Sequence, residues 1–340
     1  MRLMQGKYER FLIGDPQPPS GWRAPAMKWL AITALALAAP ALAVDDSLGP
    51  LRVQDERLLR IAEPILAANV QLCDRTMPAL GVALQSADQY SAQAQPSFAA
   101  PVAFASVLRG SAAAQAGIVR DDGLLAVDGK PVAKRPELRE SPLRDSAFTL
   151  LAEHPAGMPL MLGIVHAGQQ RELTIPVRQE CLALVEILAG QGNDARSDGR
   201  VIQIGYGLAS RATDDQIATV FAHELAHSIL HHRDRLSAAE VNKGLLGEFG
   251  RNRRLNLQAE EEADRLSVHL LANAGIDPRT AAEFWRSRLG RQLSGGIFHD
   301  RMHLSAKARA AMLDGEVARL AGALPSYPAD LLAMRNRPMK

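Results

Sequence analysis

The sequence predicts an α+β protein in which a mainly helical domain with a small β-sheet carries a mostly-β domain inserted after its first helix. Residues 51–69 place leucine and isoleucine at helical spacing, which indicates an amphipathic first helix. Between Cys73 and Cys181, short apolar runs are broken by Gly, Pro and Asp-Gly, a pattern typical of strands and turns. Residues 182–340 then show mostly helical patterns, apart from one strand at 201–207.

The composition is that of a globular protein that can bury a core. Of its 340 residues, 47% are hydrophobic and 22% are charged, and the formal net charge is +2. Aromatic residues make up only 4%, so aliphatic side chains and alanine must supply most of the core. The basic residues form no long block, and this argues against nucleic acid as a partner.

The N-terminal segment 1–43 is predicted to be an extension followed by a signal peptide. MKWLAITALALAAPALA, which starts at Met27, has a lysine, an apolar run and a final Ala-Leu-Ala, the order of a secretory signal. The sequence therefore favours Met27 as the start of translation; the alternative is an unusually long n-region. The apolar run is shorter than the roughly 20 residues of a membrane span, so no stable span is expected after cleavage. We expect a periplasmic or secreted protein of a bacterial envelope.

The first helix, within residues 44–77, is assigned to the helical domain, and residues 78–178 form the inserted domain. The inserted segment is expected to contain one helix at 145–154 and strands at 101–107, 123–129, 160–168 and 172–177. Residues 179–340 complete the helical domain.

Residues 104–132, FASVLRGSAAAQAGIVRDDGLLAVDGKPV, resemble a PDZ domain. That family binds extended peptides or C-termini by adding a strand to a sheet edge. The resemblance implies that Leu80, Gly81 and Val82 form the peptide-binding loop. The loop differs from the usual Gly-Leu-Gly-Phe at its first and last positions, and the alternative is a PDZ-like fold with only a packing role.

The stretch VFAHELAHSIL carries the pattern H-E-x-x-H. His223 and His227 lie four residues apart and therefore on one helix face, where both imidazoles can bind one metal. Glu224, beside the first histidine, can reach a metal-bound water as a general base. The alternative is a core helix with two satisfied histidines. The following residues, His231 and His232, are expected to be exposed.

A second motif lies downstream, in QAEEEADRLSVHLLANAGIDP. Together with the H-E-x-x-H pattern, Glu-Glu-Glu-Ala-Asp resembles the E-x-E-A-D motif of the HtpX/BepA-like zinc metallopeptidases, gluzincins that include the CAAX prenyl protease and the Oma-type mitochondrial proteases. The resemblance implies that Glu260 is the third zinc ligand and that Asp264 supports a ligand histidine. Glu261 and Glu262 are expected to form a solvated acidic face.

Two weaker features accompany this resemblance. HLSAKAR, 303–309, is similar to a His-Pro…Arg element of the family, with leucine in place of proline. The resemblance implies that His303 lines the cleft, binds the transition-state oxyanion or occludes the metal at rest; the alternative is a structural histidine. The strand at 201–207 precedes the H-E-x-x-H helix, as the substrate-aligning edge strand does in zincins.

These motifs predict a zinc-dependent endopeptidase with one Zn²⁺ per chain and polypeptide substrates. Zincin-type residues 179–340 would hold the metal, and the PDZ-like domain would capture unfolded or C-terminal segments. By the family resemblance, the activity would serve quality control of envelope or secreted proteins. The alternative is a metal-binding chaperone or adaptor with a vestigial protease site.

The only cysteines, Cys73 and Cys181, flank the inserted domain. The two chain ends of an inserted domain lie close together, and an oxidising compartment favours pairing. The sequence therefore predicts a Cys73–Cys181 disulfide at the neck of the insertion. The alternative is two separate buried thiols.

Overall fold

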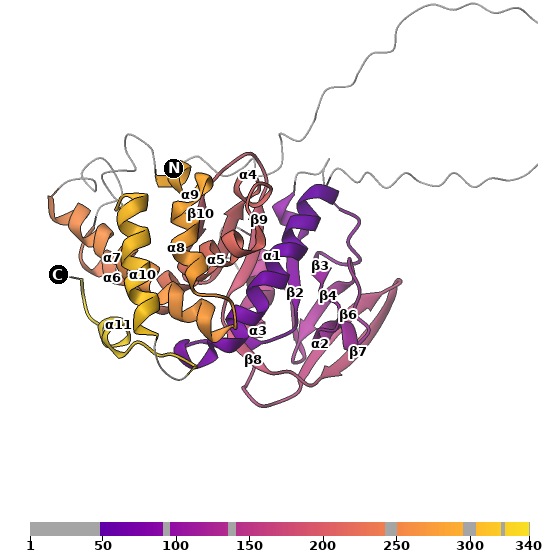
Figure 1. Cartoon of the computed structure of the whole chain (residues 1–340). Helices are drawn as coiled ribbons and strands as arrows, with labels where there is room; N and C mark the ends of the chain where they lie inside the picture. Colours follow the sequence, from indigo (N-terminus) through magenta and orange to yellow (C-terminus); the bar gives the residue numbers. More distant parts are fainter. Residues whose placement is uncertain are drawn as a thin grey trace, which may run out of the picture.

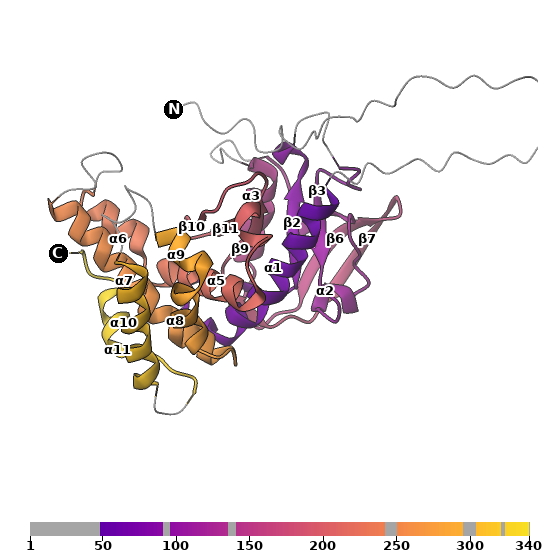
Figure 2. The same cartoon turned by 45° about the horizontal axis from the view of Figure 1, so that its top comes forward.

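The computed structural model describes residues 48–90, 96–134, 141–241, 250–294, 304–320 and 324–339. Over these residues the fold is α+β, as predicted, with most helices at one end and the largest sheet at the other (Figures 1 and 2). The first helix, α1 (Gly49–Ala68), contacts both parts and matches the helix expected at 51–69. Among the described residues, no helix combines the length and apolar character that a membrane crossing requires.

Residues 78–178, called here the inserted region, are built on one antiparallel sheet in the order β2-β3-β4-β6-β7, with β5 added to β4. The strands are β2 (Val82–Ser86), β3 (Val102–Val107), β4 (Gly123–Val127), β5 (Lys130–Pro131), β6 (Leu160–His166) and β7 (Gln169–Ile175). A 3₁₀ turn at Ala87–Gln89 and the helices α2 (Ala112–Gln115) and α3 (Pro142–Ala152) complete it. The expected helix at 145–154 and the four expected strands are therefore present.

A second sheet of three strands has the order β10-β11-β9. Its strands are β9 (Leu184–Leu188), β10 (Ala195–Ser197) and β11 (Val201–Gly205). The expectation that the strand at 201–207 is an edge strand is wrong, because β11 lies between parallel β9 and antiparallel β10. The edge strands of this sheet are β9 and the short β10, which the sequence did not reveal.

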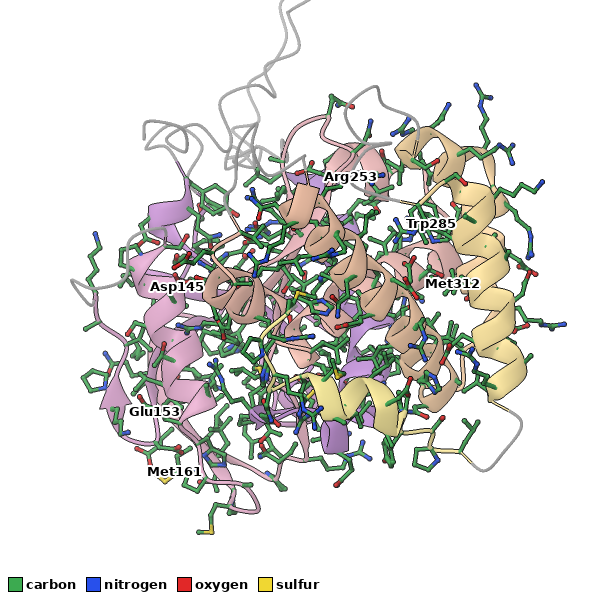
Figure 3. All side chains as sticks on the ribbon, turned by 90° about the vertical axis from the view of Figure 1, so that its left-hand side faces the viewer. Asp145, Glu153, Met161, Arg253, Trp285 and Met312 are labelled. Carbon is green, nitrogen blue, oxygen red and sulfur yellow. A yellow bond between two sulfur atoms is a disulfide. The ribbon has the colours of Figure 1, made fainter. Side chains whose placement is uncertain are left out.

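The remaining described elements are mainly helices, among which α5 and α7 contact each other and α6, α8 and α10 pack against one or both of them (Figure 1). They are α4 (Tyr206–Ala209), α5 (Asp214–Ile229), α6 (His232–Ala238), α7 (Gly250–Asn273), α8 (Arg279–Arg286), α9 (Arg288–Ser294), α10 (Ala306–Arg319) and α11 (Ala329–Met334). Trp285 and Met312 lie on this helical side, away from Asp145, Glu153 and Met161 of the inserted region (Figure 3).

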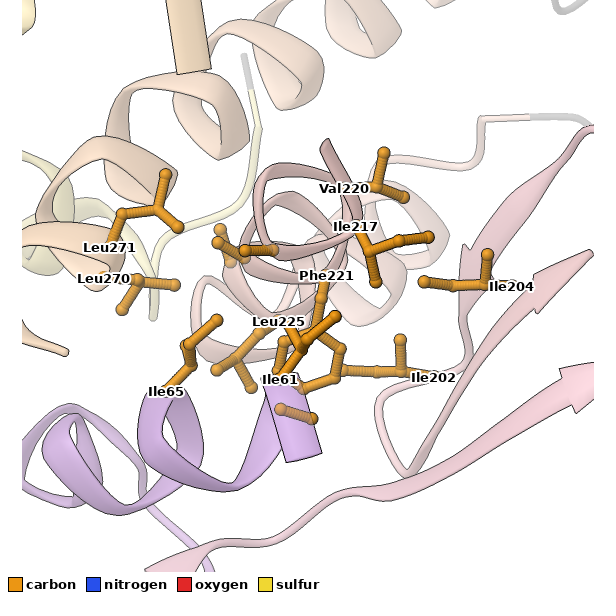
Figure 4. Close-up of a cluster of buried hydrophobic side chains, with 14 of the residues drawn as sticks. Ile61, Ile65, Ile202, Ile204, Ile217, Val220, Phe221, Leu225, Leu270 and Leu271 are labelled. Carbon is orange, nitrogen blue, oxygen red and sulfur yellow. The ribbon is translucent and has the colours of Figure 1, made fainter. Parts of the chain in front are cut away.

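Helix α5 has a defined start and a buried course. Thr213 and Gln216 form a reciprocal capping box, which satisfies two backbone N–H groups at the first turn. Further along, Phe221 is fully buried in a cluster with Ile61 of α1 and Ile202 of β11 (Figure 4). This packing against two other elements fixes the rotation of α5 about its axis and so determines which residues face outward.

Strand β9 and the residues just before it belong to two hydrophobic cores. Ala183, Val185 and Ile187 pack in the core of the helical part. Leu182 and Leu184 point the other way, into the core of the inserted region. The inserted region is therefore packed directly against the three-stranded sheet.

The predicted disulfide is present. Cys73 and Cys181 are bonded, with their Cα atoms 5.5 Å apart. The bridge lies where β1 (Thr76–Pro78) pairs with β8 (Gln179–Cys181), so it closes the two chain segments that enter and leave the inserted region.

Candidate metal centre

Helix α5 presents His223 and His227 on one face, one turn apart. Their Nε2 atoms lie 3.0 Å from each other. Both side chains are mostly buried, and their exposed parts line the same cleft. The imidazoles therefore converge on one point, as the spacing predicts.

Helix α7 supplies a carboxylate at that point. Glu260 Oε2 lies 3.4 Å from His223 Nε2, and its Oε1 lies 3.5 Å from His227 Nε2. Two imidazole nitrogens and one carboxylate oxygen are a zinc donor set, and a tetrahedral ion about 2.0–2.1 Å from each holds them roughly 3.3 Å apart. Among the described residues, these three meet the geometry of a metal site. The side chains present therefore fit the expected Zn²⁺.

The two histidines differ in electrostatic environment. Burial lowers the pKa of His227 to about 3, which keeps its ring neutral and a lone pair free. Burial also lowers the pKa of His223, but hydrogen bonds to Asp264 and Glu260 and the charges of both carboxylates raise it to about 10. Metal binding at His223 must therefore displace a proton, which makes metal affinity dependent on pH.

Glu224 follows the first histidine and is only 9% exposed. Burial raises the pKa of its carboxyl to about 7, although the nearby His223 charge opposes this. A base whose pKa lies near neutral pH is suited to taking and returning a proton. The role of Glu224 as a general base stays a prediction.

Asp264 lies one turn after Glu260 and supports His223. Its Oδ1 accepts a hydrogen bond from His223 Nδ1 at 2.9 Å. Arg309 of α10 donates to both carboxylate oxygens of Asp264 and lies 3.8 Å from Glu260 Oε2. The Arg309 guanidinium also stacks over the Trp285 ring, 3.7 Å from its centroid. Sequence reasoning did not assign a role to Arg309 or Trp285, although Arg309 ends the HLSAKAR element.

The expectation that His232 and Glu262 are solvated is wrong. His232 is 1% exposed and Glu262 is 8% exposed. His232 Nδ1 lies 2.8 Å from His227 Nδ1, and its Nε2 lies 3.1 Å from Glu262 Oε2. Arg235 also bonds Glu262, at 2.7 Å. Burial raises the pKa of Glu262, but hydrogen bonds from His232, Arg235 and Gln258 outweigh burial and lower it to about 2.

Other predicted positions fall elsewhere. His231 is half-buried and pairs with Asp74 at 2.9 Å, and Glu261 is exposed. His303 lies outside the described residues. Leu80, Gly81 and Val82 lie in the inserted region and do not line the metal cleft.

The loop before β2 is tightly integrated into the fold. Leu80 is buried, and the Gly81 carbonyl accepts a hydrogen bond from Leu108 N–H at 2.9 Å. Gln85, in β2, is tied at 3.1 Å to Asp55 of α1, which also accepts the β9 amide of Ile187 at 2.7 Å. Peptide binding at this loop stays a prediction.

A cleft of about 1380 Å³ surrounds the three candidate ligands. One wall is the edge strand β10, whose residues Ala195, Arg196 and Ser197 all contribute. Phe284 and Trp285 of α8 also line the cleft. Among the described strands, β10 pairs only with β11.

No model of a known protein family matches the chain, and no curated protein is significantly similar to it. The chemistry of the site therefore has to be inferred from the side chains of this chain alone.

Proposed function

We propose that the protein is a zinc-dependent endopeptidase of gluzincin type. The single observation that carries this proposal is the convergence of His223, His227 and Glu260 beside the buried carboxyl of Glu224. When bound, the zinc ion supplies a Lewis acid that polarises the scissile carbonyl and acidifies the attacking water.

The chain's own residues then have separate roles. His223, His227 and Glu260 hold the ion. Glu224 takes a proton from the attacking water and returns it to the leaving amine. Asp264, held by Arg309, keeps the His223 ring oriented through its Nδ1 hydrogen bond.

The proposed substrates are polypeptides in an extended conformation. The support is strand β10, which lines the cleft and, among the described strands, pairs only with β11; a peptide backbone that adds a further strand to it would lie in the cleft. The Cys73–Cys181 disulfide supports an oxidising compartment, and hence the cleavage of envelope or secreted proteins.

The proposal is tested by metal content and casein cleavage in matched variants. His223→Ala, His227→Ala and Glu260→Ala should each lose the zinc that the wild-type chain binds, about one ion per chain. Glu224→Gln should keep the zinc and lose cleavage by roughly 10²–10⁴-fold, as expected for removal of a general acid–base group. Glu261→Gln, one residue from the ligand but exposed, is the control and should behave as wild type.

The same variants distinguish the proposal from a metal-binding chaperone with a vestigial site. Zinc binding without cleavage by the wild type would favour the chaperone. Full zinc content in Glu260→Ala would refute the ligand assignment.

A further inference from the structure

His232 owes its position to the turn that separates α5 from α6. His231 lies two residues after the end of α5 and adopts a left-handed backbone, with φ 53° and ψ 34°, which separates α5 from α6. His231 consequently points toward Asp74, whereas His232 turns inward. The Nδ1 atoms of His232 and His227 then face each other at 2.8 Å.

Two facing Nδ1 atoms form a hydrogen bond only when one carries a proton and the other does not. His227 directs its Nε2 toward His223 and Glu260. If that Nε2 is a metal ligand, the proton of His227 is on Nδ1 and is donated to His232. His232 must then carry its own proton on Nε2, which faces Glu262 Oε2 at 3.1 Å.

The far end of this chain of hydrogen bonds is fixed. Glu262 accepts from Arg235 at 2.7 Å and from Gln258 at 2.7 Å. Arg235 is itself buried and is also bonded to the carbonyl of Arg337 at 3.0 Å. The Glu262 carboxylate cannot move without breaking several contacts. The hydrogen bond that it accepts from His232 Nε2 therefore fixes the orientation of the His232 ring.

We propose that His232 is a positioning residue that sets the tautomer and ring orientation of His227, and that the Glu262–Arg235 pair holds His232 in place. The two candidate ligand histidines are thus supported differently. His223 donates directly to Asp264. His227 donates to the neutral imidazole of His232, which in turn donates to the Glu262 carboxylate. This inference rests on the proposed zinc site and adds residues outside its recognised motifs.

The test compares two amides that replace different nitrogens of His232. In His232→Asn, the side-chain oxygen can take the place of the Nδ1 acceptor. In His232→Gln, the amide reaches the Nε2 position and leaves His227 without its acceptor. His232→Leu removes both groups at similar volume. His231→Asn is the control, because asparagine tolerates the left-handed backbone and the His231 side chain pairs with Asp74.

Zinc affinity is measured by competition with a chelating dye, and the visible spectrum of the Co²⁺-substituted protein reports ligand geometry. His232→Gln and His232→Leu should bind zinc roughly 10–100-fold more weakly, with an altered cobalt spectrum. His232→Asn should stay within about threefold of wild type and keep the spectrum, since it retains the acceptor. His231→Asn should match wild type.

Wild-type zinc affinity in a folded His232→Gln or His232→Leu variant would overturn the inference and leave the proposed function intact. An equal loss in the Asn and Gln variants would also overturn it, because the acceptor would then be irrelevant. If the wild-type chain binds no zinc, the proposed function fails and the inference fails with it.

Discussion

The buried ion pair between Arg144 and Glu186 should dominate the attachment of the inserted region to the three-stranded sheet. Arg144, on α3, is 2% exposed, and its Nη1 donates to Glu186 Oε2 in β9. Gln89 donates to the same oxygen at 3.1 Å, and Gln203 of β11 donates to Oε1. Gln203 in turn accepts from Arg196 of the cleft edge strand at 2.7 Å. These contacts link α3 to the wall of the cleft.

Replacing Arg144 with methionine keeps much of the packing volume but leaves the Glu186 charge buried. Removing one partner of a buried pair typically costs about 3–5 kcal/mol, because the remaining charge loses its ionic partner while it stays buried. The double variant Arg144→Met/Glu186→Gln removes both charges and should recover most of that loss, since uncharged replacements of buried pairs are often close to neutral.

Urea unfolding of the purified protein measures this difference. The control is Lys130→Met, which breaks the exposed pair with Glu153 and should cost less than about 1 kcal/mol. A loss below about 1 kcal/mol in Arg144→Met would refute the reasoning, because the pair would then not be desolvated. A double variant as unstable as the single one would show that packing, and not charge, is responsible.

Two further predictions concern the whole fold. Thiol counting on the denatured, unreduced protein should find Cys73 and Cys181 blocked, and reduction should lower the free energy of unfolding by about 2–4 kcal/mol; two free thiols would contradict this. Burial raises the pKa of Asp55 to about 7 from its ordinary 3.8. Between these two pH values the folded chain holds a proton that the unfolded chain releases, so the free energy of unfolding falls as pH rises. Asp55→Asn should flatten this slope in unfolding midpoints measured from about pH 4 to 8, and an unchanged slope would exclude Asp55 as its source.

The parts of the fold that the sequence predicted well are those with local periodicity. The first helix, the helix of the inserted region and the strands β3, β4, β6 and β7 follow from spacing and turn residues alone. The convergence of His223, His227 and Glu260 also agrees with the motif-based prediction, which the helical spacing of the two histidines supports.

The contacts that escaped prediction are polar pairs between distant segments. Strand β10 has only three residues and no apolar alternation, so no pattern marks it. Glu186 and Gln203 did leave a signal, since each interrupts an otherwise apolar strand. A polar residue inside a buried strand needs a partner, but the sequence does not say that the partner of Glu186 is Arg144, 42 positions away.

The acidic run on α7 shows most directly why side-chain roles cannot be read from motif register alone. Successive helical residues point about 100° apart, so Glu260 faces the candidate metal, Glu261 faces solvent and Glu262 faces α6. Sequence spacing correctly groups Glu260 with Asp264. It gives no information on Glu262, because burial of that carboxylate depends on Arg235 and His232, which α6 brings to the other side of α7. A charged residue is tolerated in such a place only when its partners are supplied, and those partners are determined by how the helices pack.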